Sequence, residues 1–186
     1  SQNAVGIEAT GLNVDVLPEG LIHSCKFTQV KLHALGMSNF ENRCEAWDDP
    51  SALGTANAVY IEDCEFYKND GGNCMDSNHG ARWVTRFNTV TGATEYMCHG
   101  LQDARWRGTK SWEIYENDIQ ADEDSFWTAI FLRSGTGMIW NNDITGSYTK
   151  DLRMDDERPF LSPEGPISGT GGDGYCNGGS PWDGNR

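Results

Sequence analysis

A short motif recurs along this chain at a nearly constant interval, and the interval limits the folds that the chain can adopt. Each copy has an anchor residue, with an Ile or Thr three positions before it and an apolar residue two positions after it. The stretches "WEIYENDIQ" and "GMIWNNDITG" contain the anchors Asn117 and Asn142. "VTRFNTV", "YIEDCEF" and "LIHSCKF" add the anchors Asn88, Cys64 and Cys25. The anchors lie 39, 24, 29 and 25 residues apart, so the period is near 25 residues with one long insertion.

A second, weaker series of segments lies between the anchors, and we call it the second ladder. Its members are "VKLHALG" (30–36), "CMDSNHG" (74–80), "YMCHG" (96–100), "AIFLRSG" (129–135) and "DLRMDD" (151–156). Apolar residues at helical spacing are not sustained over a dozen residues anywhere in the chain. Each repeat is therefore expected to contain at least two short strands separated by turns.

Short strands at such a period are typical of a solenoid or a propeller. Propeller blades of the WD type need longer repeats, and their tight Asn-Gly or Asp-Gly hairpins do not join the strand pairs here. A parallel β-helix fits better, because it stacks equivalent residues of successive coils. Asparagine tolerates the left-handed backbone of a tight bend, and stacked amides hydrogen-bond from coil to coil. The alternative, that Asn only marks loops, leaves the matched apolar flanks unexplained.

Several stretches of the sequence resemble those of a known protein family. These stretches are "NAVYIED", "GARWVTRFNTVTGA", "CHG", "RGTKSWEIYENDI", "FLRSGTGMIWNNDITG" and "SPWDGN". The chain resembles the right-handed parallel β-helix proteins of the pectin-lyase-like superfamily, and within it a group of bacterial secreted β-helix-repeat proteins. The resemblance covers nearly the whole chain and is most specific over 57–146. It implies the fold and a carbohydrate context, and it supplies no catalytic motif.

The expected fold class is therefore all-β, a right-handed single-stranded parallel β-helix of about seven coils that lacks one or both end caps. Residues 1–160 are expected to form the coils, with an insertion at about 37–56. Residues 161–186 are rich in Gly and are expected to form a loop or tail.

Composition restricts the partners of the chain. The formal net charge is −14 and the pI is near 4.5. Nucleic acids and anionic membrane surfaces are bound by clustered Lys and Arg, so neither is an expected partner. No apolar run is long enough to insert in a membrane. An acidic glycan would need a local basic patch or bridging cations.

Six cysteines are many for a cytosolic chain of this length. Cys25 and Cys64 share the anchor series, while Cys74 and Cys98 each lie ten residues after an anchor. If successive coils stack in register, each pair lies within the span of a disulfide, which favours an oxidising compartment. The alternative is a column of reduced, buried thiols. Six cysteines allow 15 pairings, and the sequence does not choose among them.

The second ladder and its turns gather the polar residues that are candidates for a site, because matching positions of a β-helix line a lengthwise groove. The catalytic candidates are His99, Asp76 and Asp155. The candidates for substrate binding are His79, Arg107, Arg133 and Trp106. His99 is the candidate for proton transfer, and Arg133 the candidate contact for an acidic sugar. Tryptophans 83, 106, 112, 127 and 140 offer platforms for sugar rings. The alternative is that the charged residues are solvated turn residues.

The sequence leaves the chemistry of this groove open between lyase, hydrolase and no catalysis. Elimination on a uronic acid polymer needs a base and a neutralised carboxylate, often with Ca²⁺. Hydrolysis needs two spaced carboxylates. Polygalacturonase-like members of the superfamily carry Asn-x-Asp, Asp-Asp and then Gly-His-Gly, but "CHG" precedes "NND" and "MDD" here, which argues against that hydrolase type.

Metal binding is equally open at this stage. The acidic stretches "AWDDP", "QADEDS" and "MDDERP" offer oxygen ligands of the kind that Ca²⁺ takes, without matching a known calcium motif. No HExxH or CxxC pair supports a zinc site.

Two functions remain in view. The first is an extracellular or cell-surface protein that binds or modifies a polysaccharide along one face of the coils. The second is a structural or adhesive β-helix, such as a surface, fibre or phage tailspike component, which would act within an oligomer or larger assembly.

Overall fold

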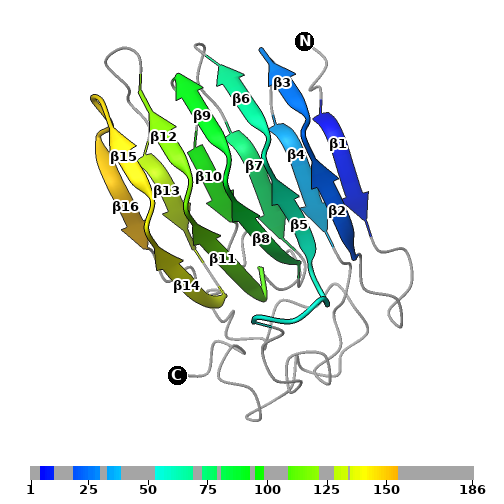
Figure 1. Ribbon diagram of the computed structural model, residues 1–186. Coiled ribbons are helices and arrows are strands. Elements are labelled where there is room, and N and C mark those ends of the chain that lie inside the picture. The colour runs from blue at the N-terminus through cyan, green and yellow to red at the C-terminus, as the bar shows by residue number, and fades with distance from the viewer. Residues whose placement is uncertain are drawn as a thin grey trace, which may run out of the picture.

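The protein was analysed as a computed structural model, and its described part consists of strands and the turns between them (Figure 1). The structure describes residues 5–10, 19–29, 33–38, 53–68, 73–78, 81–92, 95–98, 109–121, 128–133 and 135–154. The predicted tail at 161–186 and most of the predicted insertion at 37–56 lie outside these ranges. No helix with the length and apolar character of a membrane span occurs in the described part of the chain.

The strands form three sheets, here called A, B and C, in which all neighbours run parallel. Sheet A contains β1 (Val5–Thr10), β4 (His33–Ser38), β7 (Asn73–Asn78), β10 (Glu95–Cys98), β13 (Thr128–Leu132) and β16 (Lys150–Met154). Sheet B contains β2 (Gly20–His23), β5 (Val59–Glu62), β8 (Arg82–Arg86), β11 (Ser111–Tyr115) and β14 (Thr136–Trp140). Sheet C contains β3 (Lys26–Thr28), β6 (Glu65–Lys68), β9 (Thr89–Gly92), β12 (Asp118–Gln120) and β15 (Asp143–Thr145).

The chain visits the three sheets in rotation, so each sheet takes every third strand. After β1, successive strands pass from sheet B to C to A in five complete turns. Figure 1 shows the turns following one another from the blue N-terminal strands to the yellow β14–β16. The prediction of an all-β, parallel fold is confirmed. The period predicts about seven coils over the whole length of the chain. The described residues contain five complete turns.

The asparagine anchors form the continuous column of amides that the repeat predicts. Nδ2 of Asn88 donates to Oδ1 of Asn117 at 3.0 Å, and Nδ2 of Asn117 donates to Oδ1 of Asn142 at 2.9 Å. The same oxygens accept the backbone N–H groups of Asn88 and Asn117, at 3.2 and 3.1 Å. Oδ1 of Asn88 accepts the backbone N–H of Cys64 at 2.9 Å. Each side chain therefore fixes the backbone of the preceding turn.

The left-handed residue of each bend is the one before the anchor, and the expectation that the Asn itself adopts this conformation is wrong. The residues directly before the anchors have φ between 49° and 58°, and all five are exposed: Ser24, Asp63, Phe87, Glu116 and Asn141. An anchor amide has to face its counterparts in the next turns, so the preceding residue makes the bend and turns its side chain outward.

The residues expected to fill the interior do so where a neighbouring strand lies on each side. Ile61, Phe66, Val90, Ile114 and Ile119 are at most 3% exposed. Two further predicted residues are only partly buried although they pack against the same core. These are Ile139 and Ile144. They lie on β14 and β15, each of which is the last described strand of its sheet.

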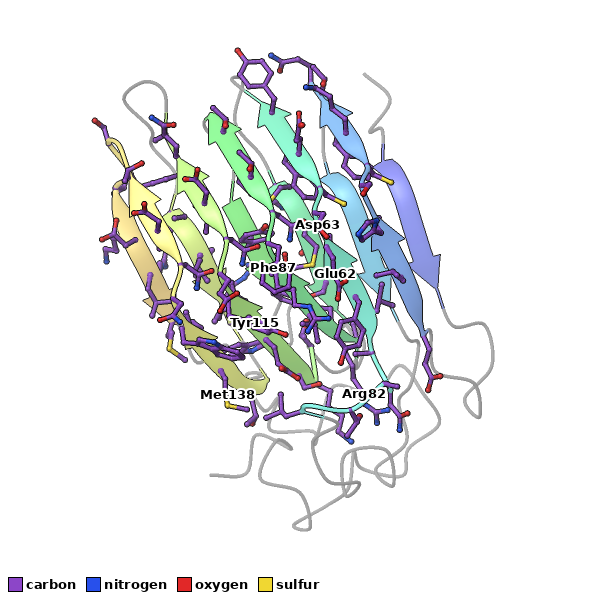
Figure 2. All side chains as sticks on the ribbon, viewed as in Figure 1. Glu62, Asp63, Arg82, Phe87, Tyr115 and Met138 are labelled. Carbon is purple, nitrogen blue, oxygen red and sulfur yellow. The ribbon has the colours of Figure 1, made fainter. Side chains whose placement is uncertain are left out.

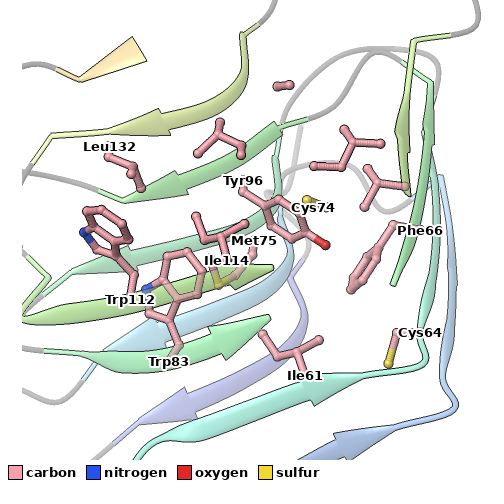
Figure 3. Close-up of a cluster of buried hydrophobic side chains, with 14 of the residues drawn as sticks. Ile61, Cys64, Phe66, Cys74, Met75, Trp83, Tyr96, Trp112, Ile114 and Leu132 are labelled. Carbon is pink, nitrogen blue, oxygen red and sulfur yellow. The ribbon is translucent and has the colours of Figure 1, made fainter. Parts of the chain in front are cut away.

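Two of the five tryptophans predicted to be sugar platforms belong to the core instead. Trp83 and Trp112 are 1% and 3% exposed and lie among the buried side chains of Figure 3. Trp83 Nε1 donates to Ser77 Oγ at 2.9 Å. A Cβ at Gly137 would lie 1.8 Å from the carbonyl oxygen of Trp112, so only glycine fits beside this ring. Trp106 and Trp127 lie outside the described residues.

One of the two predicted cysteine pairings is correct in its placement. Cys25 and Cys64 are neighbours in the anchor column, since Lys26 and Glu65 are partners in register and Glu65 N donates to Cys25 O at 2.9 Å. The structure has free thiols at both, and at Cys74.

The pairing of Cys74 with Cys98 is wrong. The register between β7 and β10 shifts between Glu95 and Tyr96, which pair with Asn73 and Met75. Cys74 therefore lies at the level of Glu95 and Tyr96, near the start of β10, whereas Cys98 is the last residue of that strand.

The amide column gives the first testable prediction. Asn117→Ala should lower the free energy of unfolding by about 2–5 kcal/mol, because it leaves several buried polar groups of Asn88 and of the strands without a partner. Urea unfolding followed by circular dichroism measures the loss. Asn142→Ala removes an amide at the end of the column and should cost less. An equal loss in the two variants would contradict the cooperative column.

Candidate functional site

The structure describes only two of the seven side chains expected to form a site on the second ladder. Asp76 lies on β7 and Arg133 directly follows β13, two strands away in sheet A. Both are buried, at 8% and 7% exposure. The other candidates, His79, His99, Trp106, Arg107 and Asp155, lie outside the described residues, so their gathering stays a prediction.

Arg133 is packed on an aromatic ring. Its Cζ atom lies 4.9 Å from the ring centroid of Phe131, and Cζ of Arg153 lies 4.3 Å from the same centroid. Two guanidinium groups therefore share one ring, a favourable cation–π arrangement. Burial and this packing give Arg133 a structural role that is independent of any sugar.

The described residues also offer little support for a metal site. They contain no group of three His, Cys, Asp or Glu side chains placed to hold an ion. The acidic stretches that suggested Ca²⁺ have their carboxylates at 48–49, 122–124 and 155–157, outside the described residues.

The outer face of sheet B carries a different row of side chains, which we call the sheet B row. Register pairing places one residue from each of the five strands at the same level. The members are His23, Glu62, Arg86, Tyr115 and Trp140. Figure 2 shows Glu62 and Tyr115 over the middle of this sheet, together with Phe87 of the adjoining bend.

Arg86 is the centre of the sheet B row. Its Nε donates to Glu62 Oε1 at 2.7 Å, Nη2 pairs with the same oxygen, and Nη1 donates to the Tyr115 hydroxyl at 2.6 Å. Its Cζ lies 5.1 Å from the ring centroid of Tyr60, 5.4 Å from that of Phe87 and 5.7 Å from that of Tyr115. One guanidinium thus holds a carboxylate and three rings in place.

Aromatic stacking continues the row to its C-terminal end. The rings of Tyr115 and Trp140 are stacked, with centroids 3.9 Å apart and planes 10° apart. Phe87 meets Tyr115 edge to face at 6.2 Å. Three apolar side chains here remain substantially exposed, namely Phe87 at 45%, Met138 at 47% and Trp140 at 37%.

A loop at 53–58 covers the neighbouring level of the same face. Gly54 N donates to Glu113 Oε1 at 2.7 Å, and the Tyr60 hydroxyl donates to Thr55 O at 2.6 Å. Glu113 is therefore only 6% exposed although it points away from the core. The sheet B row lies beside this covered region, and in it His23 and Trp140 are exposed while the other three members are partly buried.

The titratable groups of this face are tuned by their neighbours. Burial raises the pKa of Tyr60, and the negative charge of Glu113 adds to the effect, so the phenol stays protonated. Burial lowers the pKa of Arg86, but its hydrogen bonds to Tyr115 and Glu62 outweigh that and leave the pKa raised. The face therefore presents the charged guanidinium of Arg86 and the protonated phenol of Tyr60.

Comparison of the chain with models of protein families, with curated proteins and with solved structures finds no match. The kind of ligand that the outer face of sheet B could bind is therefore inferred from its own residues. Side-by-side rings flanked by hydrogen-bonding groups suit a ligand with both apolar and hydroxyl-bearing surface.

Sequence reasoning missed the sheet B row although the motif contains it. Every member lies two positions before an anchor. Side chains alternate between the faces of a strand, and the residue three before the anchor faces inward, so the residue two before it must face outward. Aligning the repeats at that position gives His, Glu, Arg, Tyr and Trp.

Arg86 provides the prediction for this face. Arg86→Lys should lower the free energy of unfolding by about 1–3 kcal/mol, because a lysine cannot bond Glu62 and Tyr115 together through a planar fork. Lys26→Gln is the control, since it breaks the exposed pair of Lys26 with Glu65, which is worth less than about 1 kcal/mol. Equal losses in urea unfolding would show that Arg86 organises nothing.

Proposed function

We propose that the protein binds a neutral polysaccharide along the outer face of sheet B. In this proposal the chain is a right-handed parallel β-helix of the pectin-lyase-like type, as its motifs imply, and acts outside the cell. The rotation of strands through three parallel sheets supports the fold. The function rests on the residues of the sheet B row.

The observation that most supports this proposal is the exposed group of aromatic rings around Arg86. Trp140, Tyr115 and Phe87 are neighbours on one face, and Trp140 and Phe87 keep 37% and 45% of their surface accessible. Aromatic rings bury much area with little loss of side-chain entropy, which suits the apolar faces of pyranose rings. The three rings come from three successive turns, so they follow one another along one axis, which fits a polymer.

The charge of the face favours a neutral glycan over an acidic one. Exposed carboxylates are contributed by Asp63 and Glu116, whereas Arg86 is already paired with Glu62. An additional negative charge on a sugar would be repelled here. This differs from the acidic sugar that the sequence suggested for Arg133, a residue of sheet A.

A second function is supported by the same contacts. The ring of Tyr115 is stacked on Trp140, and Arg86 is bonded within the molecule, so the sheet B row also works as a column that ties successive turns together. On this basis the protein is a structural or adhesive element, and no glycan is required.

Affinity electrophoresis in gels that contain a neutral glucan, a xylan or polygalacturonate distinguishes the two functions. Trp140→Ala should weaken binding to a neutral polymer at least tenfold, about 1.4 kcal/mol. Tyr67→Ala is a matched control, because Tyr67 has the same 37% exposure but lies on the outer face of sheet C.

The outcome of this comparison decides between the two functions. Retarded migration of the wild type and of Tyr67→Ala, with loss in Trp140→Ala, supports the sheet B row as the binding face. If no polymer retards the wild type, or if both variants bind as well as the wild type, the structural function is favoured.

A further inference from the structure

The first two positions of the anchor column hold thiols where the next three hold amides. Cys25 and Cys64 occupy the places that Asn88, Asn117 and Asn142 take in later turns. A thiol cannot make the paired amide contacts of those turns. Between Cys25 and Cys64 the column therefore lacks the amide-to-amide bonds of the later turns, although Asn88 Oδ1 accepts the backbone N–H of Cys64.

The backbone brings the two cysteines to the same level on adjacent strands. Cys25 directly precedes Lys26, and Cys64 directly precedes Glu65. Lys26 and Glu65 are partners in register, and Glu65 N donates to Cys25 O at 2.9 Å. Adjacent parallel strands lie about 4.8 Å apart. Disulfides join residues whose Cα atoms are about 4.4–6.8 Å apart, so the spacing is suitable.

Both thiols donate to backbone carbonyl oxygens of residues that come two or three positions before an anchor. Cys64 Sγ donates to Glu62 O of its own turn at 3.2 Å and to Ile22 O of the preceding turn at 3.6 Å. Cys25 Sγ donates to His23 O of that preceding turn at 3.4 Å. The thiol of Cys64 thus reaches across to the turn that carries Cys25.

We propose that Cys25 and Cys64 are a cross-linking site, which a small-molecule disulfide such as oxidised glutathione converts to a protein disulfide. The bond would join the first two anchor positions covalently, where the amide bonds of the later turns are missing. It would also close the long insertion, because the segment from 26 to 63 lies between the two cysteines.

The accessibility of the two thiols sets the order of the reaction. Cys25 is half-buried and Cys64 is buried, so the thiolate of Cys25 attacks the small disulfide first and releases one glutathione thiolate. The thiolate of Cys64 then attacks the sulfur of Cys25 and releases the second glutathione. Two cysteine thiols lose two protons and two electrons, and one glutathione disulfide becomes two thiols. Burial raises the pKa of Cys64, so the second step should accelerate as the pH rises.

Cys74 provides an internal comparison. It is also buried, at 2% exposure, but it lies at the level of the first residues of β10, whereas Cys98 is the last residue of that strand. Its replacement should leave the cross-link unchanged.

The test treats the full chain with oxidised glutathione at pH 8.5, blocks the remaining thiols and maps the tryptic peptides without reduction. Trypsin leaves Cys25 alone in peptide 1–26, but it leaves Cys64 together with Cys44 in peptide 44–68. Cys44→Ser removes that ambiguity. We expect a linked species of these two peptides in the wild type, in Cys44→Ser and in Cys74→Ser, and its absence in Cys25→Ser.

Thermal unfolding supplies a second measurement on the same samples. The midpoint should rise by about 5–10 °C on oxidation, because a disulfide that encloses a long segment restrains the unfolded chain, and dithiothreitol should reverse the rise. The proposal is overturned if Cys25 remains a stable glutathione adduct. It is also overturned if peptide 1–26 is linked to another cysteine, or if the linked species disappears in Cys44→Ser. None of these results bears on glycan binding.

Discussion

The described structure depends on the pairing of side-chain amides at one bend of each turn. A bend in a stack of parallel strands leaves backbone N–H groups that no strand partner reaches, and burying them unpaired would be costly. The carboxamide oxygen of each asparagine accepts an N–H from the preceding turn, and the NH₂ groups of Asn88 and Asn117 donate to the asparagine of the next turn. With this bond in place, inward and outward positions are fixed on both flanking strands. Both the core and the outer face of sheet B follow from that register.

Inward and outward positions accept different residue types because the register keeps each position on one face of its sheet. Inward positions are restricted to residues such as Ile61 and Ile114, which must match their neighbours in volume. Outward positions have no such restriction, and there the turns differ from one another. Arg86, Tyr115 and Trp140 are thus free to form a contact surface on a scaffold that stays constant beneath them.

Much of this arrangement was predictable from the spacing of the anchors, and the remainder depended on details that spacing does not contain. The amide column and the buried flanks were predicted because Asn88, Asn117 and Asn142 share one offset pattern. The same rule, carried further, assigns Trp83 and Trp112 to the interior, since both lie five residues before an anchor, in phase with the inward residue three before it. The second ladder was less predictable. Cys74 and Cys98 lie at the same distance from their anchors, but β7 begins later after its anchor than β10 does, so Cys74 lies near the start of its strand and Cys98 at the end.

The bend before each anchor places stability and surface chemistry in conflict at Phe87. This residue has φ of 58°, a left-handed conformation that is unfavourable for a bulky side chain and that glycine adopts freely. Glycine at this position would relax the backbone, and it would also remove the ring that meets Tyr115 and Arg86. The conformational cost at Phe87 is therefore borne by the same residue whose ring completes the aromatic group on sheet B. Backbone relaxation and loss of that ring would come together in one substitution.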